Sequence, residues 1–145
     1  MKFKRILAAV LTATTLLTSG VSTTTFAETT EVHEPALCYE MLNTAVPTLS
    51  FDGNTAYCET TAHATASVTR MTMVQTLQRK SLFVWSDVDG ASWTKTASGS
   101  YIDMYKSFSV SRSGTYRVEV EITMTSSNGS TETVTVHSVE VDVDI

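Results

Sequence analysis

Apolar and polar residues alternate over most of residues 48–145, with the period of two that an extended strand imposes on its side chains. The longest alternation covers residues 115–125, where the even positions hold Tyr, Val, Ile or Met and the odd positions hold Thr, Arg or Glu. Thr, Val and aromatic residues, which favour half-buried strands, dominate this part of the chain. We therefore expect a β-domain in which each strand buries one face.

The alternation changes parity inside the last predicted strand, residues 132–145. Apolar residues occupy even positions as far as Val136 and odd positions from Val139 onward. Since a period of two cannot change parity without an extra residue, we predict a β-bulge at His137 and Ser138.

The same parity predicts the hairpin between the last two strands. Their apolar residues share one face only if the connecting loop holds an odd number of residues, which excludes a two-residue Asn128-Gly129 turn. The three-residue loop Ser127-Asn128-Gly129 satisfies the pattern as a type I turn followed by Gly129 in the left-handed conformation of a G1 bulge.

The remaining apolar residues predict further strands. Residues 52–54 (Asp-Gly-Asn) predict a turn, and the polar residues through Asp87, Asp89 and 97–100 predict a loop. Residues 82–85 form a short apolar run between two alternating faces. The first face holds Ala62, Ala64, Ala66 and Val68, continued by Met71, Met73 and Leu77 with Gln75 as an interruption, and the second holds Ile102, Met104, Phe108 and Val110 with Lys106 as an exception.

About seven short strands in about 100 residues are typical of an all-β, immunoglobulin-like two-sheet antiparallel sandwich. A closed barrel is the alternative architecture. The sequence Gly114-Thr115-Tyr116 is typical of the start of strand F in immunoglobulin-like domains, where a tyrosine braces the corner by hydrogen-bonding back to the chain. We assign Trp85 to the core, as the tryptophan that packs between the sheets.

Residues 1–27 have the features of a secretory signal peptide. Three basic residues precede an apolar stretch at 6–17, and Thr25-Phe26-Ala27 fits a signal-peptidase site with cleavage after Ala27. The apolar stretch is shorter than the about 20 residues that cross a bilayer, so we expect a secreted protein, extracellular or cell-wall associated, with no membrane contact after cleavage. Residues 28–47 are an expected polar leader with one short helical turn at 35–42, and residues 48–145 form the sandwich domain.

The charge distribution argues against a nucleic-acid partner. Residues 1–27 hold 3 of the 10 Lys and Arg and none of the 15 Asp and Glu, so the remainder has 7 against 15 and a formal charge of −8. The seven basic residues are scattered along the sequence without an evident patch, whereas phosphate backbones are bound by clustered positive charge.

Two cysteines follow the signal peptide, Cys38 and Cys58. Export places them where a disulfide persists, and a bridge would stabilise the fold by about 3 kcal/mol by constraining the unfolded chain. The alternative is two separately buried thiols, because free cysteine is among the most buried residue types.

No combination of residues forms a recognisable catalytic or metal-binding motif. His33, His63 and His137 fall in the leader, on an outward strand face and at the expected bulge, without a nucleophile elbow or a zinc motif. Cys58 and His63 fit no zinc spacing. The segment 87–90 (Asp-Val-Asp-Gly) has the alternating carboxylates of a calcium loop but lacks the other ligands, so we interpret it as an acidic turn. We expect no catalytic, cofactor or metal site.

Aromatic residues gather around the expected central loop. With Trp85 assigned to the core, Trp93 and Tyr101 become the candidates for surface contacts. Exposed aromatic side chains on a sandwich combine a large apolar area with a polar group, which suits the binding of a protein or a glycan.

Residues 77–79 read Leu-Gln-Arg, a tryptophan follows at Trp85 or Trp93, and residues 114–118 read Gly-Thr-Tyr-Arg-Val. In these elements the stretch 58–143 resembles a family of small secreted β-sandwich domains of unknown function from Gram-positive bacteria. The resemblance implies the fold and the exported location, and it assigns no activity to any residue.

The complete sandwich pattern and the lack of a catalytic motif favour a non-enzymatic, secreted binding or interaction module, whose contacts lie on loops held by a rigid scaffold. The alternative is a secreted bacteriocin-like or inhibitory protein, which acts through the same kind of surface. A hydrolase whose site is assembled from residues distant in sequence is a further hypothesis.

Overall fold

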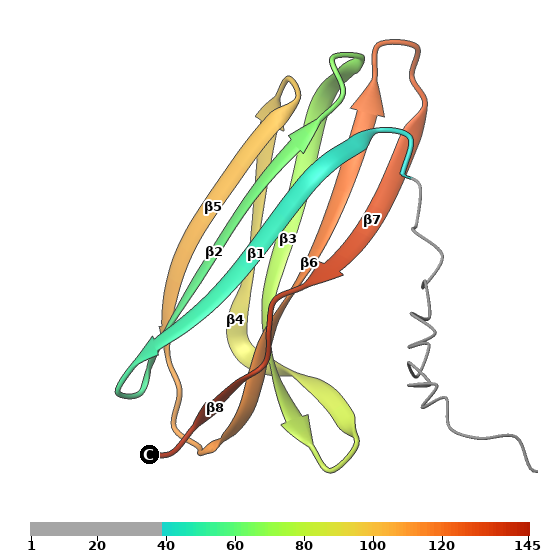
Figure 1. Ribbon diagram of the computed structural model, residues 1–145. Helices are drawn as coiled ribbons and strands as arrows, with labels where there is room; N and C mark the ends of the chain where they lie inside the picture. The colour runs from blue at the N-terminus through green and yellow to red at the C-terminus, as the bar shows by residue number, and fades with distance from the viewer. Residues whose placement is uncertain (1–38) are drawn as a thin grey trace, which may run out of the picture. The chain divides into compact units, whose positions relative to one another are not determined.

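The computed structural model describes residues 39–145, which form eight β-strands in two packed antiparallel sheets (Figure 1). The strands are β1 (Leu42–Asp52), β2 (Thr55–Ala64), β3 (Val68–Ser81), β4 (Val84–Ser98), β5 (Tyr101–Ser109), β6 (Gly114–Ser126), β7 (Thr131–His137) and β8 (Val141–Val143). These residues contain no helix. The expected all-β sandwich is confirmed.

The strand order is that of an immunoglobulin-like domain. One sheet has the order β1-β2-β5, and the other has the order β4-β3-β6-β7, with β8 pairing along the beginning of β6. In immunoglobulin lettering, β1, β2 and β5 correspond to strands A, B and E, and β4, β3, β6 and β7 correspond to C′, C, F and G. The two sheets share no ladder of hydrogen bonds, so the alternative of one closed sheet does not apply.

The inner faces of the two sheets form one apolar core. In β6 the predicted inward residues, Tyr116, Val118, Val120, Ile122 and Met124, are all buried. Met71, Met73 and Leu77 of β3 are buried in the same core as the small residues Ala56, Cys58 and Ala62 of β2. The alternation of apolar and polar positions therefore places the core where the sequence predicts it, since side chains on a strand point alternately to its two faces.

Gln75, which interrupts the apolar face of β3, is buried between the sheets, and both its amide oxygen and its amide nitrogen are hydrogen-bonded. Its Oε1 accepts a hydrogen bond of 2.6 Å from the Thr60 hydroxyl, and its Nε2 donates one of 3.2 Å to the carbonyl of Cys58. A buried amide without partners would cost about 1–3 kcal/mol, so Thr60 and the Cys58 carbonyl make this core position acceptable.

The predicted β6–β7 hairpin is confirmed. The amide of Gly129 donates a hydrogen bond of 3.0 Å to the carbonyl of Ser126, and Gly129 has a φ of +86°, as the left-handed position of the turn requires. Ile122 lies opposite Val134, so the apolar residues of the two strands share the inner face.

The predicted bulge near Ser138 is also confirmed. Glu119 lies opposite His137, and Tyr116 lies opposite Val141, so three steps along β6 match four steps along the partner strands. Ser138 stays attached to β6 because its amide donates to the Val118 carbonyl and its hydroxyl accepts from the Val118 amide. Val139 is exposed beside the bulge, which corrects the expectation that it points inward.

The sandwich begins earlier than predicted. The strand β1 starts at Leu42 instead of residue 48, and residues 39–42 of the expected helical turn are not helical. Pairing with β2 extends the strand, because Leu42 lies opposite Ala64. The predicted signal peptide, its cleavage after Ala27, and residues 28–38 with Cys38 lie outside the described residues.

The continuous strand predicted through Ala66 is in fact two strands. A turn at residues 65–67 separates β2 from β3, and the amide of Val68 donates to the Thr65 carbonyl. Ala66 is exposed in this turn. The parity of Ala64 and Val68 is the same on both sides of the turn, so the alternation alone does not reveal the break.

The polar loop expected around residues 86–100 is mostly the long strand β4. It lies at the edge of its sheet, where one side of the backbone is unpaired and polar side chains are favoured. Only Gly99 and Ser100 remain in the connection to β5. The low apolar content of an edge strand is the reason for the wrong assignment.

Candidate functional site

A hairpin formed by the end of β3 and the start of β4 extends beyond the rest of the sandwich (Figure 1). The pairing of β3 with β6 ends at Arg79 and Tyr116, whereas Lys80 and Ser81 pair only with Trp85 and Val84. We call residues 80–85 the β3–β4 arm. Because one side of it lacks a neighbouring strand, the arm is free to contact another molecule on most of its surface.

A wide bulge in β4 directs the arm away from the sheet. Thr76 lies opposite Ser92 and Gln78 lies opposite Asp87, so two steps along β3 match five steps along β4. Gly90 lies in this bulge with a φ of +79°, a conformation that glycine adopts at little cost. The Asp-Val-Asp-Gly segment therefore serves as a strand bulge and not as the predicted turn.

The tip of the arm is apolar and exposed. Leu82, Phe83 and Val84 are 88, 95 and 65% exposed. Leu82 has a φ of +57°, and only the first of the two turn residues is left-handed, as in a type II′ turn, where glycine is the preferred residue. A non-glycine residue in this conformation costs about 1–3 kcal/mol. Leu82 therefore destabilises the turn in which it lies.

Trp85 lies on the arm and not in the core. Its ring is 5.3 Å from the Lys80 ammonium and 4.3 Å from the Arg117 guanidinium, both of which are cation–π distances. The core assignment of Trp85 is wrong because Trp85 belongs to the arm, beyond the last pairing of β3 with β6. The tryptophan instead stiffens the arm against the outer side of β6.

Trp93 takes the inner position that was expected for Trp85. It lies opposite the buried Gln75 and packs against the core, with its ring 6.4 Å from that of Phe108. Trp93 is therefore partly buried and not fully exposed as expected, since residues opposite each other in a ladder share a face, and its role as a contact stays a prediction. Tyr101 is 47% exposed and its ring lies 4.8 Å from that of His63, so its role as a contact stays a prediction.

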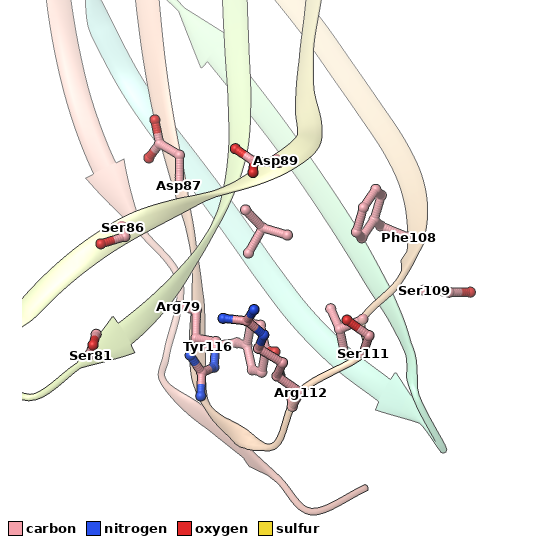
Figure 2. A pocket seen from close by; sticks show the side chains of 12 residues that line it. Arg79, Ser81, Ser86, Asp87, Asp89, Phe108, Ser109, Ser111, Arg112 and Tyr116 are labelled. Atoms are coloured by element: carbon pink, nitrogen blue, oxygen red, sulfur yellow. The ribbon is translucent and has the colours of Figure 1, made fainter.

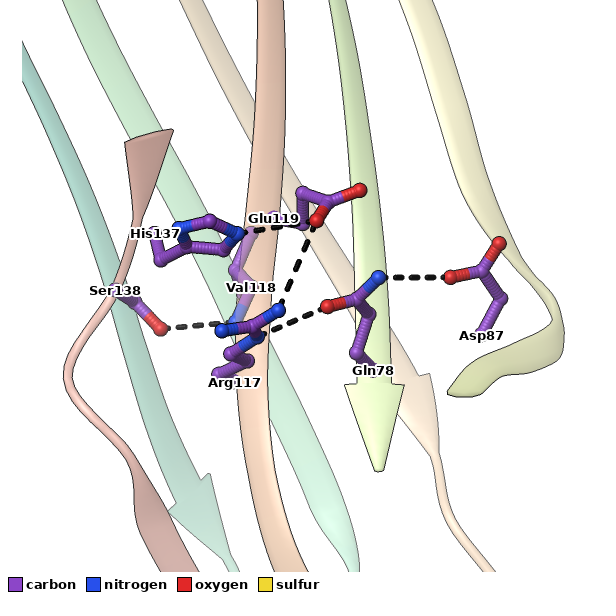
Figure 3. A network of polar contacts seen from close by, with 7 residues as sticks. All are labelled: Gln78, Asp87, Arg117, Val118, Glu119, His137 and Ser138. Atoms are coloured by element: carbon purple, nitrogen blue, oxygen red, sulfur yellow. Dashed lines mark hydrogen bonds and ion pairs between the residues drawn. The ribbon is translucent and has the colours of Figure 1, made fainter. Parts of the chain in front are cut away.

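A chain of polar contacts crosses β7, β6, β3 and β4 at the base of the arm (Figure 3). His137 Nε2 lies 3.0 Å from Glu119 Oε2, which lies 3.8 Å from Arg117 Nη2. Arg117 Nε donates to Gln78 Oε1 at 2.9 Å, and Gln78 Nε2 donates to Asp87 Oδ1 at 2.9 Å. The network fixes the base of the arm to the sheet.

A pocket of about 370 Å³ opens beside the base of the arm, between β4 and the connection from β5 to β6 (Figure 2). Arg79, Arg112 and Tyr116 lie together on one side, and Asp89 and Phe108 lie on the other. The pocket was not predicted, because its residues come from three separate stretches of sequence. The conspicuous Asp-Val-Asp-Gly segment was the one signal that pointed to this region.

The side chain of Arg79 is held by the backbone of the β5–β6 connection. Its Nε and Nη2 donate hydrogen bonds of 3.1 and 2.7 Å to the carbonyl of Ser113. A Cβ atom on Gly114 would lie 2.9 Å from Arg79 Nε, and Gly114 has a φ of +148°. Glycine at position 114 therefore provides both the space and the conformation that this contact requires.

The structure brings together several basic residues that are scattered along the sequence. Four of the seven that follow residue 27 lie at this end of the sandwich, namely Arg79, Lys80, Arg112 and Arg117. Lys80 is 3.4 Å from a carboxylate oxygen of Glu140, and Arg117 is paired with Glu119. The two arginines of the pocket form no ion pair within residues 39–145.

The other candidate residues do not come together. Cys58 is buried in the core, where burial raises the pKa of its thiol from 9.0 to about 12, whereas His63 lies on the outer face. His137 belongs to the other sheet. In the described part of the chain, no three His, Cys, Asp or Glu side chains are grouped to hold a metal ion. The disulfide stays a prediction, because Cys38 lies outside that part.

No protein-family model, curated protein or solved structure matches this chain. The resemblance based on residues 77–79 and 114–118 stays a prediction. The structure places these two segments side by side, with Leu77 opposite Val118, Gln78 opposite Arg117 and Arg79 opposite Tyr116. Both motifs thus belong to the base of the arm.

Among residues 39–145, no helix is long and apolar enough to cross a membrane.

Proposed function

We propose that the protein is an exported, non-enzymatic binding module that inserts the tip of its β3–β4 arm into an apolar cleft of a protein partner. The observation that carries this proposal is the exposure of three consecutive apolar side chains, Leu82, Phe83 and Val84, at the end of a hairpin. Exposure of apolar side chains to water is unfavourable, and their burial against a partner lowers the free energy.

The conformation of the tip supports a role outside folding. Glycine or asparagine at position 82 would form the turn with less strain than Leu82, whose φ is +57°. Strain of this kind concentrates at binding sites, where the side chain contributes more to a contact than it costs the fold.

The stiffness of the arm supports the same role. The Trp85 ring lies within cation–π distance of both Lys80 and Arg117. At the base of the arm, the Gln78 side chain is hydrogen-bonded to both Arg117 and Asp87. A binding element that is ordered before association loses less conformational entropy when it binds. The tip is therefore presented in one orientation.

The size of the tip sets the expected strength of binding. Complete burial of a side chain such as Leu82 or Phe83 contributes roughly 1.5–3 kcal/mol. Association itself costs about 4–15 kcal/mol, so three such residues are an anchor and not a whole interface. A stable interface buries about 800 Å² on each partner, so the sides of the arm must contact the partner too.

The proposal is tested by affinity capture from the medium and cell-surface fraction in which the protein is found. The tip variant Leu82→Gly/Phe83→Ser should lose the partner at least tenfold, because its anchor is gone. The matched control is Val46→Thr, which removes an exposed apolar side chain from the outer face of β1, 57% exposed, and should retain the partner.

Equal capture by wild type and the tip variant would refute the proposal, as would loss of capture in the control alone. Concentration-dependent self-association through Phe83 would also refute it, because the occupant would then be a second copy. A growth-inhibition assay with wild type and the tip variant tests whether the partner belongs to a competing bacterium, which is the inhibitory alternative.

A further inference from the structure

We propose that the pocket beside the arm binds a small ligand through a carboxylate group held by Arg112 and Arg79. The pocket volume of about 370 Å³ falls within the range of small-molecule sites. This inference does not depend on the docking of the arm, since the pocket lies at the base of the arm, away from its tip.

Arg79 is oriented before any ligand arrives. Its Nε and Nη2 are fixed by the Ser113 carbonyl, and no protein partner for its Nη1 is found within residues 39–145. A guanidinium that is held in place by neutral backbone keeps its full positive charge available to the pocket.

Arg112 is positioned through its backbone. Its carbonyl accepts a hydrogen bond of 2.5 Å from the hydroxyl of Tyr116, which is buried in the core. In the described part of the chain, the guanidinium of Arg112 has neither an ion pair nor a hydrogen bond. Figure 2 shows it on the same side of the pocket as Arg79.

The chemistry of the two walls defines the ligand. Guanidinium groups bind planar carboxylates through two parallel hydrogen bonds. On the opposite side the Asp89 carboxylate has no hydrogen bond or ion pair to the rest of residues 39–145. It is available to accept hydroxyl or ammonium hydrogens of a ligand, and its charge disfavours a ligand with many negative charges. Phe108 and Val88 supply an apolar contact. The ligand therefore combines one carboxylate with hydrogen-bond donors.

A sugar acid and the C-terminal end of a peptide both have this chemistry. The test is a titration of the exported protein, followed by NMR chemical shifts, with glucuronic acid, with N-acetyl-alanyl-alanine, and with the matched neutral probes glucose and N-acetyl-alanyl-alanine amide. At least one acid should bind, and its neutral counterpart should bind at least tenfold more weakly. The acid that binds identifies the source.

Two variants and a control complete the test. Arg112→Gln removes an exposed charge and should weaken acid binding at least tenfold, with an unchanged melting temperature. Gly114→Ala displaces Arg79 and should weaken it as well. Arg70→Gln removes an exposed charge at the other end of β3 and should leave binding intact.

The inference is overturned if neither acid binds, or if acids and neutral probes bind equally. It is also overturned if Arg70→Gln weakens binding as much as Arg112→Gln does. None of these results affects the proposal for the arm, which is measured by partner capture.

Discussion

The hydroxyl of Tyr116 donates a hydrogen bond of 2.5 Å to the backbone carbonyl of Arg112, four residues earlier in the chain. This bond is the tyrosine corner of immunoglobulin-like domains. It links the core, in which the Tyr116 ring is buried, to the connection that carries Arg112 into the pocket. The same element thus contributes to stability and to the geometry of the candidate site.

Replacement of the corner tyrosine tests its energetic role. Tyr116→Phe keeps the ring and its contact with Phe51 but removes the donor to Arg112. We expect the free energy of unfolding to fall by about 1–2 kcal/mol in urea denaturation, because one partly buried hydrogen bond is lost. A change below about 0.3 kcal/mol would contradict the role of the corner, since surface substitutions alone have effects of that size.

The buried pair Thr60 and Gln75 allows a double-mutant cycle. Thr60→Val leaves the Gln75 Oε1 without its donor and should cost about 1–3 kcal/mol. Thr60→Val/Gln75→Leu should cost less than the sum of the two single variants, because the pair is removed together. Additive effects in chemical denaturation would show that the two side chains do not interact.

Leu82→Gly separates stability from binding. Glycine relieves the strain at φ +57° but is more flexible in the unfolded chain, so we expect a net gain of about 0.5–1 kcal/mol in the free energy of unfolding. Calorimetry of this variant against wild type is the measurement. A loss of more than about 1 kcal/mol would mean that the Leu82 side chain stabilises the fold.

Arg117→Met tests whether the network stiffens the arm. It removes the contacts of Arg117 with Trp85 and Gln78, each of which contributes about 0.5–2 kcal/mol. Hydrogen exchange at the amides of residues 80–85 should accelerate about tenfold, because local opening becomes easier. Arg70→Met is the control and should leave that exchange unchanged. Unchanged hydrogen exchange at these amides in Arg117→Met would show that the contacts of Arg117 do not stiffen the arm.

The burial of Cys58 predicts a pH dependence in a Cys38→Ser variant, in which Cys58 is necessarily a thiol. Its pKa is raised by burial from 9.0 to about 12, so the folded state holds the proton more tightly than the unfolded state. The resulting stability is complete below about pH 9 and falls between pH 9 and 12, by up to about 1.4 kcal/mol per pH unit.

Urea denaturation of Cys38→Ser and of Cys38→Ser/Cys58→Ala across this range isolates the contribution of the thiol. The difference in unfolding free energy between the two variants should shrink as the pH rises. A constant difference would mean that Cys58 is not buried as a thiol.

Parity in the sequence predicts the parts of the fold that are buried on one face. The alternation over residues 115–125 identifies the inner face of β6, and the change of parity locates the bulge at Ser138. Both predictions hold because a one-residue shift would turn every apolar side chain of these strands to water.

The alternation of apolar and polar positions does not predict the edge strand β4 or the β3–β4 arm. The strand β4 has few apolar residues because it is half-solvated, so its sequence does not show that Trp93, and not Trp85, packs against the core. The pocket joins Arg79, Asp89 and Arg112, which are separated in sequence and meet only through the register of β3, β4 and β6. The exposed tip was not predicted either, because residues 82–85 were interpreted as a short apolar run and Leu82 and Phe83 are not the Gly and Asn that two-residue turns favour.

Site-specific photocross-linking from position 83 tests the central claim most directly. A benzophenone side chain placed at Phe83 should form one discrete adduct with a partner protein, and the same group placed at Val46 should form none. Adducts of the same pattern from both positions, or from neither, would contradict the account of the arm as a docking element.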